Sequence, residues 1–163
     1  MAEWELAQIN VGRLRAPVDD PFVAEFMAAL DPINALADAS AGFRWRLQTE
    51  DGNATAVRPY EDDSILINMS VWASVEALGD YVYRSDHTAF LRRRREWFER
   101  LVEAAFALWW IPAGHRPAVD EGVARLDHLS AHGPTAFAFT FRTRFGPGAT
   151  GEVAGDPRDV CRA

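Results

Sequence analysis

The sequence predicts an α+β fold of the ferredoxin-like type, on the basis of its length, its composition and the order of its expected strands and helices. A chain of 163 residues is long enough for one well-buried core and too short for two ordinary domains. Hydrophobic residues make up 48% of it and charged residues 25%, which is typical of a globular protein. We therefore expect one folded domain over residues 1–145, followed by a flexible tail over 146–163 that is rich in glycine, proline and small polar residues.

Hydrophobic periodicity and terminating residues predict each element in turn. A strand over 3–11 precedes Asp19-Asp20-Pro21, which supplies an N-cap and a first-turn proline for a helix ending near residue 39. Strands over 43–50 and 64–72 follow, and Ser74 caps a helix over 75–84 that is succeeded by another over 87–104. The last elements are a strand over 105–111, a helix over 119–131 and a strand over 135–143. The order β-α-β-β-α-β is that of ferredoxin-like folds, with a helix and a strand added.

Alternation gives each of these strands one apolar side and one mixed side. We assign to the helices the apolar side, which holds Ala7, Ile9, Val11, Phe43, Trp45, Leu47, Ile65, Ile67, Met69, Val71, Phe137, Phe139 and Phe141. The mixed side holds Gln8, Asn10, Arg46, Gln48, Asn68, Ser70 and Thr140 beside Trp4, Leu6, Leu66, Trp72 and either Trp109 or Trp110. Apolar walls with a few amides, hydroxyls and a guanidinium are typical of a small-molecule site, whereas a half-solvated antiparallel sheet would look the same.

The mixed side also predicts an oligomer. A sheet with helices on one face needs cover for the other, and a second copy of the chain supplies it most simply. Because symmetric dimers are the commonest oligomers, we expect a homodimer.

Composition and charge argue against several other partners. The net charge of -7 disfavours nucleic acid, and the run Arg92 to Arg95 is followed by Glu96 and Glu99, so a salt-bridged helix surface is favoured over a phosphate site. No stretch approaches the roughly 18 apolar residues of a membrane span, and the N-terminus is acidic, so we expect a cytosolic protein that does not bind membranes. The single cysteine, Cys161, excludes a disulfide within one chain.

Several segments resemble one bacterial family, catalogued as domain of unknown function thirty-two ninety-one. They are Trp4-Glu5-Leu6-Ala7-Gln8-Ile9-Asn10, Asp31-Pro32-Ile33-Asn34-Ala35-Leu36-Ala37-Asp38, Gly42-Phe43-Arg44-Trp45-Arg46-Leu47, Asn68-Met69-Ser70-Val71-Trp72, Tyr83-Arg84-Ser85-Asp86-His87 through Arg95-Glu96-Trp97-Phe98, and Trp109-Trp110-Ile111-Pro112-Ala113-Gly114-His115. The resemblance covers residues 3–143. It implies a dimeric α+β barrel similar to the antibiotic-biosynthesis monooxygenases, and little about the reaction.

Histidines are the first candidates for chemistry. His87 opens a predicted helix, where the helix dipole favours the neutral ring, so it is either a base near pH 7 or a cap held by a carbonyl. His115 lies in a proline-bounded loop and is either functional or a loop-packing residue. His128 and His132 have chelating i,i+4 spacing without the acid of a zinc-protease motif, which favours a solvated helix face, and we predict no metal site.

These observations leave three functions open. The leading hypothesis is a cofactor-independent oxygenase, cyclase or isomerase acting on an apolar, oxygen-bearing substrate, with His87 as acid or base and Arg46 and Asn68 stabilising oxyanion charge. Binding residues would be Gln8, Asn10, Gln48, Ser70, Trp72, Trp109 and His115. The second is a non-catalytic ligand-binding or stress-response protein with the same cavity. In the third, which needs a cofactor where the others need none, His87 or His115 is the axial ligand of a haem.

Overall fold

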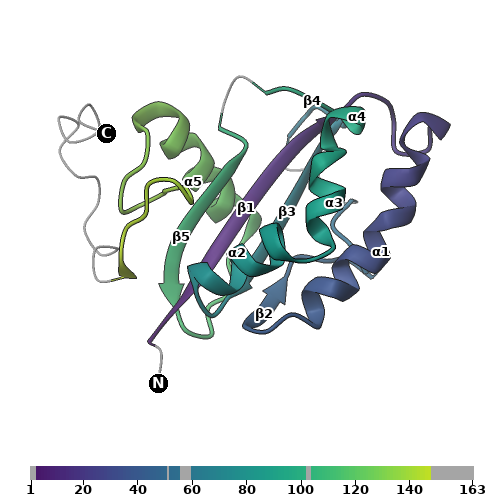
Figure 1. The fold of residues 1–163 in the computed structure, drawn as a ribbon. Helices are drawn as coiled ribbons and strands as arrows, with labels where there is room; N and C mark the ends of the chain where they lie inside the picture. The colour runs from purple at the N-terminus through teal and green to yellow at the C-terminus, as the bar shows by residue number, and fades with distance from the viewer. Residues whose placement is uncertain (1–2, 51, 56–59, 102–103, 148–163) are drawn as a thin grey trace.

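The long first strand, β1 (Trp4–Leu14), is the centre of the sheet in the computed structural model, which describes residues 3–50, 52–55, 60–101 and 104–147 (Figure 1). It pairs antiparallel with β3 (Ile65–Trp72) on one edge and with β5 (Phe106–Pro112) on the other. β2 (Phe43–Arg46) lies outside β3, and the short β4 (Phe98–Glu99) pairs with the end of β1. The order β2-β3-β1-β5, with antiparallel neighbours, is that of a ferredoxin-like sheet, which confirms the predicted fold class.

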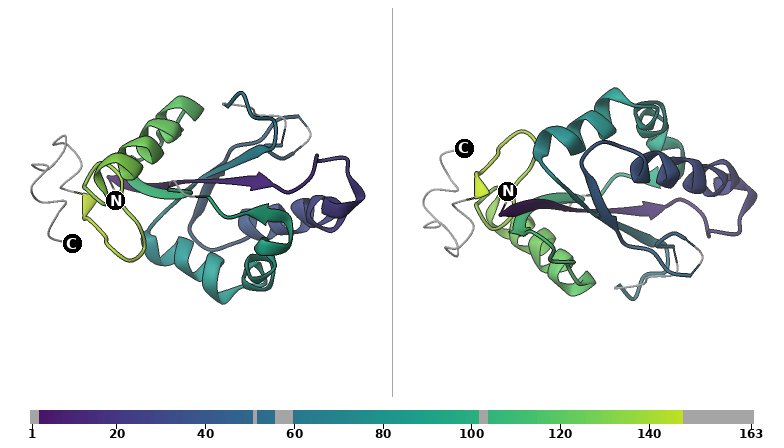
Figure 2. Two further views of the ribbon diagram at one scale, coloured as in Figure 1. Left: turned by 90° about the horizontal axis from the view of Figure 1, so that it is seen from above. Right: turned by 90° about the horizontal axis from the view of Figure 1, so that it is seen from below.

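Helices lie on both faces of this sheet, as the views from above and from below in Figure 2 show. On one side are the 3-10 turn η1 (Pro21–Val23), α1 (Ala24–Asp38), α2 (Val75–Arg84), α3 (His87–Arg92) and α4 (Arg94–Trp97). On the other side is α5 (Val119–His132). No helix within the described ranges is both long and apolar enough to cross a membrane.

Two helix starts are formed by the capping residues that the sequence predicts. The carboxylate of Asp20 accepts a hydrogen bond from the Phe22 backbone N–H at 2.8 Å, and proline occupies the first position of η1. The Ser74 hydroxyl accepts from the Ala77 backbone N–H at 3.1 Å. The helix predicted over 75–84 therefore begins and ends as expected.

The apolar face of the sheet is covered by α5, not by α1 to α4. Leu126 and Leu129 of α5 pack in one buried cluster with Ile9 and Met69 of the sheet. The helix comes close because Gly122 faces the sheet: a Cβ atom there would lie 2.9 Å from both Ile9 Cδ1 and Met69 Cε. Our assignment of the other helices to this face is wrong. The homodimer loses the support of an uncovered face and stays a prediction.

A β-bulge in β2 also overturns part of the predicted alternation. Phe43 pairs with Trp72 and Trp45 pairs with Val71, so two steps along β2 match one step along β3, with Arg44 as the extra residue. Phe43 therefore packs on the mixed face with Trp72, while Trp45 packs on the apolar face as predicted. A one-residue irregularity of this kind leaves no mark in an apolar-polar pattern.

The later elements differ from expectation in two places. The helix predicted over 87–104 breaks at Arg93 and ends at Trp97, because Phe98 is extended and pairs with Leu14 in β4. The strand predicted over 135–143 is not formed beyond one bridge between Phe139 and Leu108. Of the predicted tail, residues 148–163 lie outside the described ranges.

Backbone hydrogen bonds explain the missing strand. The chain closes one turn from Thr135 N–H to the Ala138 carbonyl at 2.8 Å and another from Thr140 to Thr143 at 3.3 Å. Phe137 consequently joins the cluster under α5, whereas Phe139 packs on the opposite side, so the phenylalanines do not share one face as predicted.

Candidate functional site

A cavity of about 390 Å³ lies between the mixed face of the sheet and α1 to α4. β1 and β3 supply its polar side, and β2 contributes Arg46. Helix α1 contributes a stripe at helical spacing that includes Phe26, Leu30 and Ile33, and the cavity is completed by Leu78 of α2 and by Phe90 of α3. The mixed face thus lines a small-molecule-sized space with apolar walls that the helices supply.

A connected group of polar side chains occupies the floor of this cavity. The Gln8 amide donates to Asn68 Oδ1 at 2.7 Å and to Ser70 Oγ at 2.8 Å, and Asn10 Nδ2 donates to Gln8 Oε1 at 3.1 Å. Ser70 Oγ also accepts from the buried indole N–H of Trp72 at 2.8 Å. These residues meet because Gln8 pairs with Ser70, and Asn10 with Asn68, across β1 and β3. We call Gln8, Asn10, Asn68 and Ser70 the polar floor.

Asn68 presents a fixed hydrogen-bond donor to the cavity. Asn68 Oδ1 accepts from both Gln8 and Asn10, which fixes the orientation of its carboxamide. Its Nδ2 group has no hydrogen-bond partner among the described residues, and Asn68 lines the cavity. This geometry suits the binding of a ligand oxygen, because a fixed N–H donor in an apolar space interacts strongly with a carbonyl or an oxyanion.

Arg46 lines the same cavity but is already paired. Its Nε and Nη2 atoms donate to the two carboxylate oxygens of Asp38 at 2.7 and 3.3 Å, and Nη1 donates to the Gly52 carbonyl at 2.6 Å. The side chain is largely buried, and a bidentate pair of this kind is rigid. Arg46 therefore ties α1 to the end of β2, and its positive charge is largely neutralised by Asp38.

Aromatic rings form the wall beside the polar floor. Trp72 is fully buried and stacks on Tyr81 with ring centroids 5.1 Å apart. Phe43 packs against Trp72 in a T-shaped arrangement with ring centroids 5.4 Å apart. The Tyr81 hydroxyl donates to the Ile33 carbonyl at 3.2 Å. Burial raises the pKa of this hydroxyl above its ordinary range, so Tyr81 stays protonated and anchors α2 to α1.

His87 lies at the start of α3 with its ring 4.7 Å from the Tyr81 ring, and it lines the cavity. Its Nδ1 atom is 3.3 Å from the Val82 carbonyl, an acceptor that selects the tautomer with the proton on Nδ1. Nε2 is then the basic atom, and it has no partner within the described part of the chain. Burial lowers the pKa of His87 below 6.5, an effect that the Val82 carbonyl partly offsets, so the ring is neutral at pH 7.

Three predicted binding residues lie outside the cavity. Trp109 pairs with Ala7 on the opposite face of the sheet, where its indole N–H donates to Glu121 at 3.1 Å, so it belongs to the core under α5. His115 is exposed in the loop after β5, and its Nε2 lies 2.8 Å from the other Glu121 oxygen. Gln48 is exposed because β2 ends at Arg46. Trp110, which pairs with Leu6, lies on the mixed face that the sequence offered for Trp109 or Trp110, but among the described residues it does not line the cavity.

The other two histidines lie side by side on α5. The rings of His128 and His132 are 4.5 Å apart on α5, and His128 Nε2 lies 3.0 Å from the Thr135 hydroxyl. In the ranges that the structure describes, no group of three or more histidine, cysteine, aspartate or glutamate side chains could hold a metal ion.

The sequence pattern of the family described as Domain of unknown function (DUF3291) matches residues 5–154. The chain belongs to this family. The match spans every element of the cavity and confirms the family that the motifs indicated. No curated protein matches the chain.

Several solved structures are similar to this DUF3291 member. The cofactor-independent oxygenase SnoaB from Streptomyces nogalater has a TM-score of 0.45 at 15% identity, over 71% of this chain and 96% of that one. The protein of unknown function NE2512 from Nitrosomonas europaea has a TM-score of 0.44 at 14% identity, over 71% and 97%. A ferredoxin-like dabb family protein from Mesorhizobium loti has a TM-score of 0.43 at 19% identity, over 68% and 99%. None of these values bears on the reaction.

Apart from His87, the cavity residues that the helices contribute were not predicted from the sequence. Phe26, Tyr81, Phe90 and Arg94 all line the cavity of this DUF3291 member, and Asp38 holds Arg46 in place. A signal for α1 existed, because its apolar residues recur at helical spacing. That spacing shows that the helix has a buried face, but not which side of the sheet the face meets.

Proposed function

We propose that this protein binds an apolar, oxygen-bearing small molecule in the cavity and that His87 removes a proton from it. The observation that carries the proposal is the pairing of one neutral imidazole with a fixed carboxamide donor in a largely apolar cavity. Of the four histidines, only His87 is part of the described cavity lining. A base and a donor that share one apolar cavity are the groups that proton abstraction next to a carbonyl requires.

The chemistry follows from the atoms that are free. The substrate carbonyl oxygen accepts a hydrogen bond from Asn68 Nδ2, and His87 Nε2 takes the proton from the adjacent carbon. The electron pair of the broken C–H bond moves onto the carbonyl oxygen as an enolate, which the Asn68 donor stabilises. Trp72 and Tyr81 hold the apolar body of the substrate against the polar floor.

This step is common to the three reactions that the sequence left open. Return of the proton to another atom gives an isomerase, attack of the enolate carbon within the molecule gives a cyclase, and addition of molecular oxygen, which is then the oxidant, gives an oxygenase. The proposal therefore concerns the proton transfer and not the step that follows it.

Deuterium exchange tests this step directly. Anthrone, a planar aromatic ketone with an acidic CH₂ group, is incubated with the protein in D₂O without oxygen, and its deuterium content is followed by mass spectrometry. We expect exchange above the buffer rate, and a loss of about 100-fold or more of the protein-dependent rate in His87→Gln. The matched control is His115→Gln, which lies outside the cavity and should keep the rate. A His87→Gln protein that exchanges as fast as the unmodified chain would contradict the assignment.

The non-catalytic and haem alternatives make different predictions in the same experiments. A binding protein would bind anthrone without accelerating exchange. A haem protein would use His87 as axial ligand, since His115 lies outside the cavity, and would show an intense visible absorption band after reconstitution that His87→Gln removes.

A further inference from the structure

The charge of the cavity differs from that of the whole chain. The protein carries 24 acidic and 17 basic residues and a net charge of -7. Among the described residues, however, no aspartate or glutamate lines the cavity, whereas Arg46 and Arg94 do. Asp38 neutralises Arg46 from behind the lining. One uncompensated positive charge, that of Arg94, therefore remains at the cavity.

Arg94 stands where the cavity meets solvent. It is exposed and yet part of the lining, and its guanidinium carbon lies 6.0 Å from the centre of the Phe98 ring, another lining residue. It makes no ion pair with any residue that the structure describes. The acids nearby are engaged elsewhere, since Glu25 and Glu96 both pair with Arg93.

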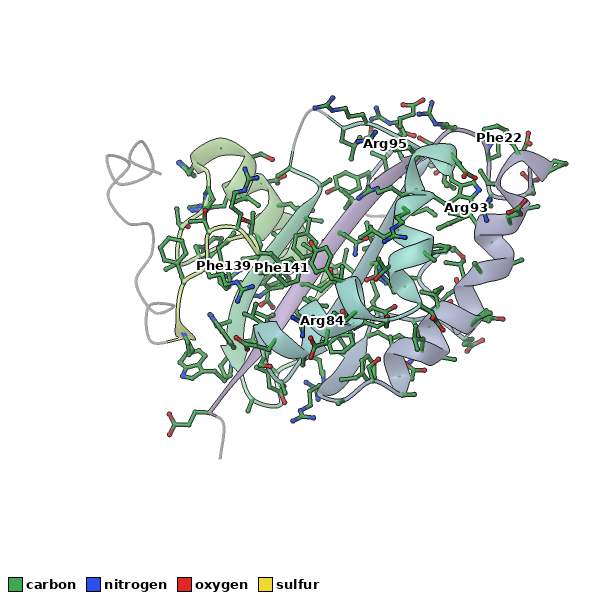
Figure 3. The ribbon with its side chains drawn as sticks, viewed as in Figure 1. Phe22, Arg84, Arg93, Arg95, Phe139 and Phe141 are labelled. Carbon is green, nitrogen blue, oxygen red and sulfur yellow. The ribbon has the colours of Figure 1, made fainter. Side chains whose placement is uncertain are left out.

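The two arginines that flank Arg94 supply a comparison. Figure 3 shows Arg93 and Arg95 at the α4 end of the molecule, away from Phe139 and Phe141 beside β5. The Arg93 guanidinium donates hydrogen bonds to the carboxylates of Glu25 and Glu96. Arg95 is exposed like Arg94 and is absent from the described lining of the cavity. Arg94 and Arg95 are therefore neighbours in the sequence with the same charge and similar exposure, but only Arg94 lines the cavity as the structure describes it.

We infer that the ligand of the proposed site is an apolar acid, whose carboxylate is bound by Arg94 at the open edge of the cavity while its apolar body lies against the aromatic wall. This inference rests on the proposed function, because it assigns the substrate class of the same cavity. A planar guanidinium matches a carboxylate with two parallel hydrogen bonds. The acidic surface of the chain repels anions at long range, so the selection of an anion depends on this local charge.

Two probes of one shape test the inference: 2-naphthoate and its neutral methyl ester, with dissociation constants measured by calorimetry at low ionic strength. We expect the unmodified protein to bind the acid about tenfold more tightly than the ester, as a partly desolvated charged hydrogen bond allows. Arg94→Gln should remove this preference by weakening the acid alone. Arg95→Gln should keep it, and Arg94→Lys should restore part of it.

The outcomes separate this inference from the proposed function. If the ester binds and Asn68→Ala weakens it, but the acid has no advantage or keeps its advantage in Arg94→Gln, the anionic substrate class is wrong and the cavity stands. If neither probe binds, the proposed cavity site fails together with the inference. Since Arg94 is exposed, its variants should melt at the temperature of the unmodified protein, which excludes unfolding as the cause.

Discussion

Two neighbouring residues of β3 should respond in opposite ways to the same truncation. Met69 is fully buried in the cluster under α5, whereas Asn68 faces the cavity on the other side of the sheet. Met69→Ala removes buried methylene and sulfur atoms and leaves a hole between the sheet and α5. We expect it to lower the free energy of unfolding by about 2–5 kcal/mol, as buried large-to-small substitutions do.

Asn68→Ala should cost much less stability. The two groups that donate hydrogen bonds to Asn68 Oδ1 each keep another acceptor in this variant. Gln8 Nε2 still donates to Ser70 Oγ, and Asn10 Nδ2 still donates to Gln8 Oε1. No donor is therefore orphaned, and the expected loss is that of ordinary hydrogen bonds, about 0.5–1.5 kcal/mol. Ligand binding, in contrast, should weaken in Asn68→Ala and persist in Met69→Ala wherever that variant folds.

Urea denaturation at constant temperature measures both stability changes, provided that the dependence of the unfolding free energy on urea concentration is the same in the variants and the unmodified protein. The decisive quantity is the difference between the two variants. An Asn68→Ala protein that loses more stability than Met69→Ala would show that the two faces of the sheet are exchanged, and the cavity would lose its polar floor.

Two glycines, Ser70 and His87 should each respond to substitution in a way that their contacts determine. Gly42 and Gly52 have φ values of +83° and +80°, so both alanine variants should lose about 1–2 kcal/mol of unfolding free energy through backbone strain. A Cβ at Gly42 would also lie 2.6 Å from a methyl carbon of α2, whereas a Cβ at Gly52 would meet nothing within 4 Å. Gly42→Ala should therefore lose about 1–3 kcal/mol more than Gly52→Ala in thermal or urea unfolding. Ser70→Ala leaves the buried Trp72 N–H without its acceptor and should cost about 1–3 kcal/mol. Burial lowers the pKa of His87 below 6.5, so the unfolded chain binds a proton that the folded chain does not, and stability should fall as pH drops below about 6.5, less steeply in His87→Gln.

Each of these predictions has a result that opposes it. Equal losses in Gly42→Ala and Gly52→Ala would remove the close contact with α2. A neutral Ser70→Ala would mean that the indole N–H finds another acceptor. Identical pH dependence of stability in the unmodified and His87→Gln proteins would mean that His87 is not buried, because the remaining histidines are the same in both.

The sequence predicted the order of strands and helices along the chain, and the residues of the polar floor, because these depend on local patterns. Alternation along β1 and β3 placed Gln8, Asn10, Asn68 and Ser70 on one side, and antiparallel pairing brings them together. The capping of α2 by Ser74 was equally readable, since a cap involves residues three positions apart.

What the sequence did not predict depends on contacts between distant elements. An amphipathic helix shows that it packs on something, but the choice of face for α5 depends on a close approach at Gly122, which has no local signature. The bulge at Arg44 reversed the side of Phe43 for a similar reason, because only the pairing with β3 reveals it. The lining residue Arg94 looked like part of a solvated arginine run, since its contact with the cavity arises from the break between α3 and α4.

We propose that the mixed face of the sheet binds a small molecule through its polar floor. The measurement that tests this is NMR: the chemical shifts of the side-chain amide N–H groups are followed during titration with 2-naphthoate, and the signals are assigned from single-residue variants. Gln8 and Asn68 should shift saturably, while Gln48, which is exposed and outside the cavity, should not move. A ligand that binds and shifts Gln48 while Gln8 and Asn68 stay unchanged would contradict the claim.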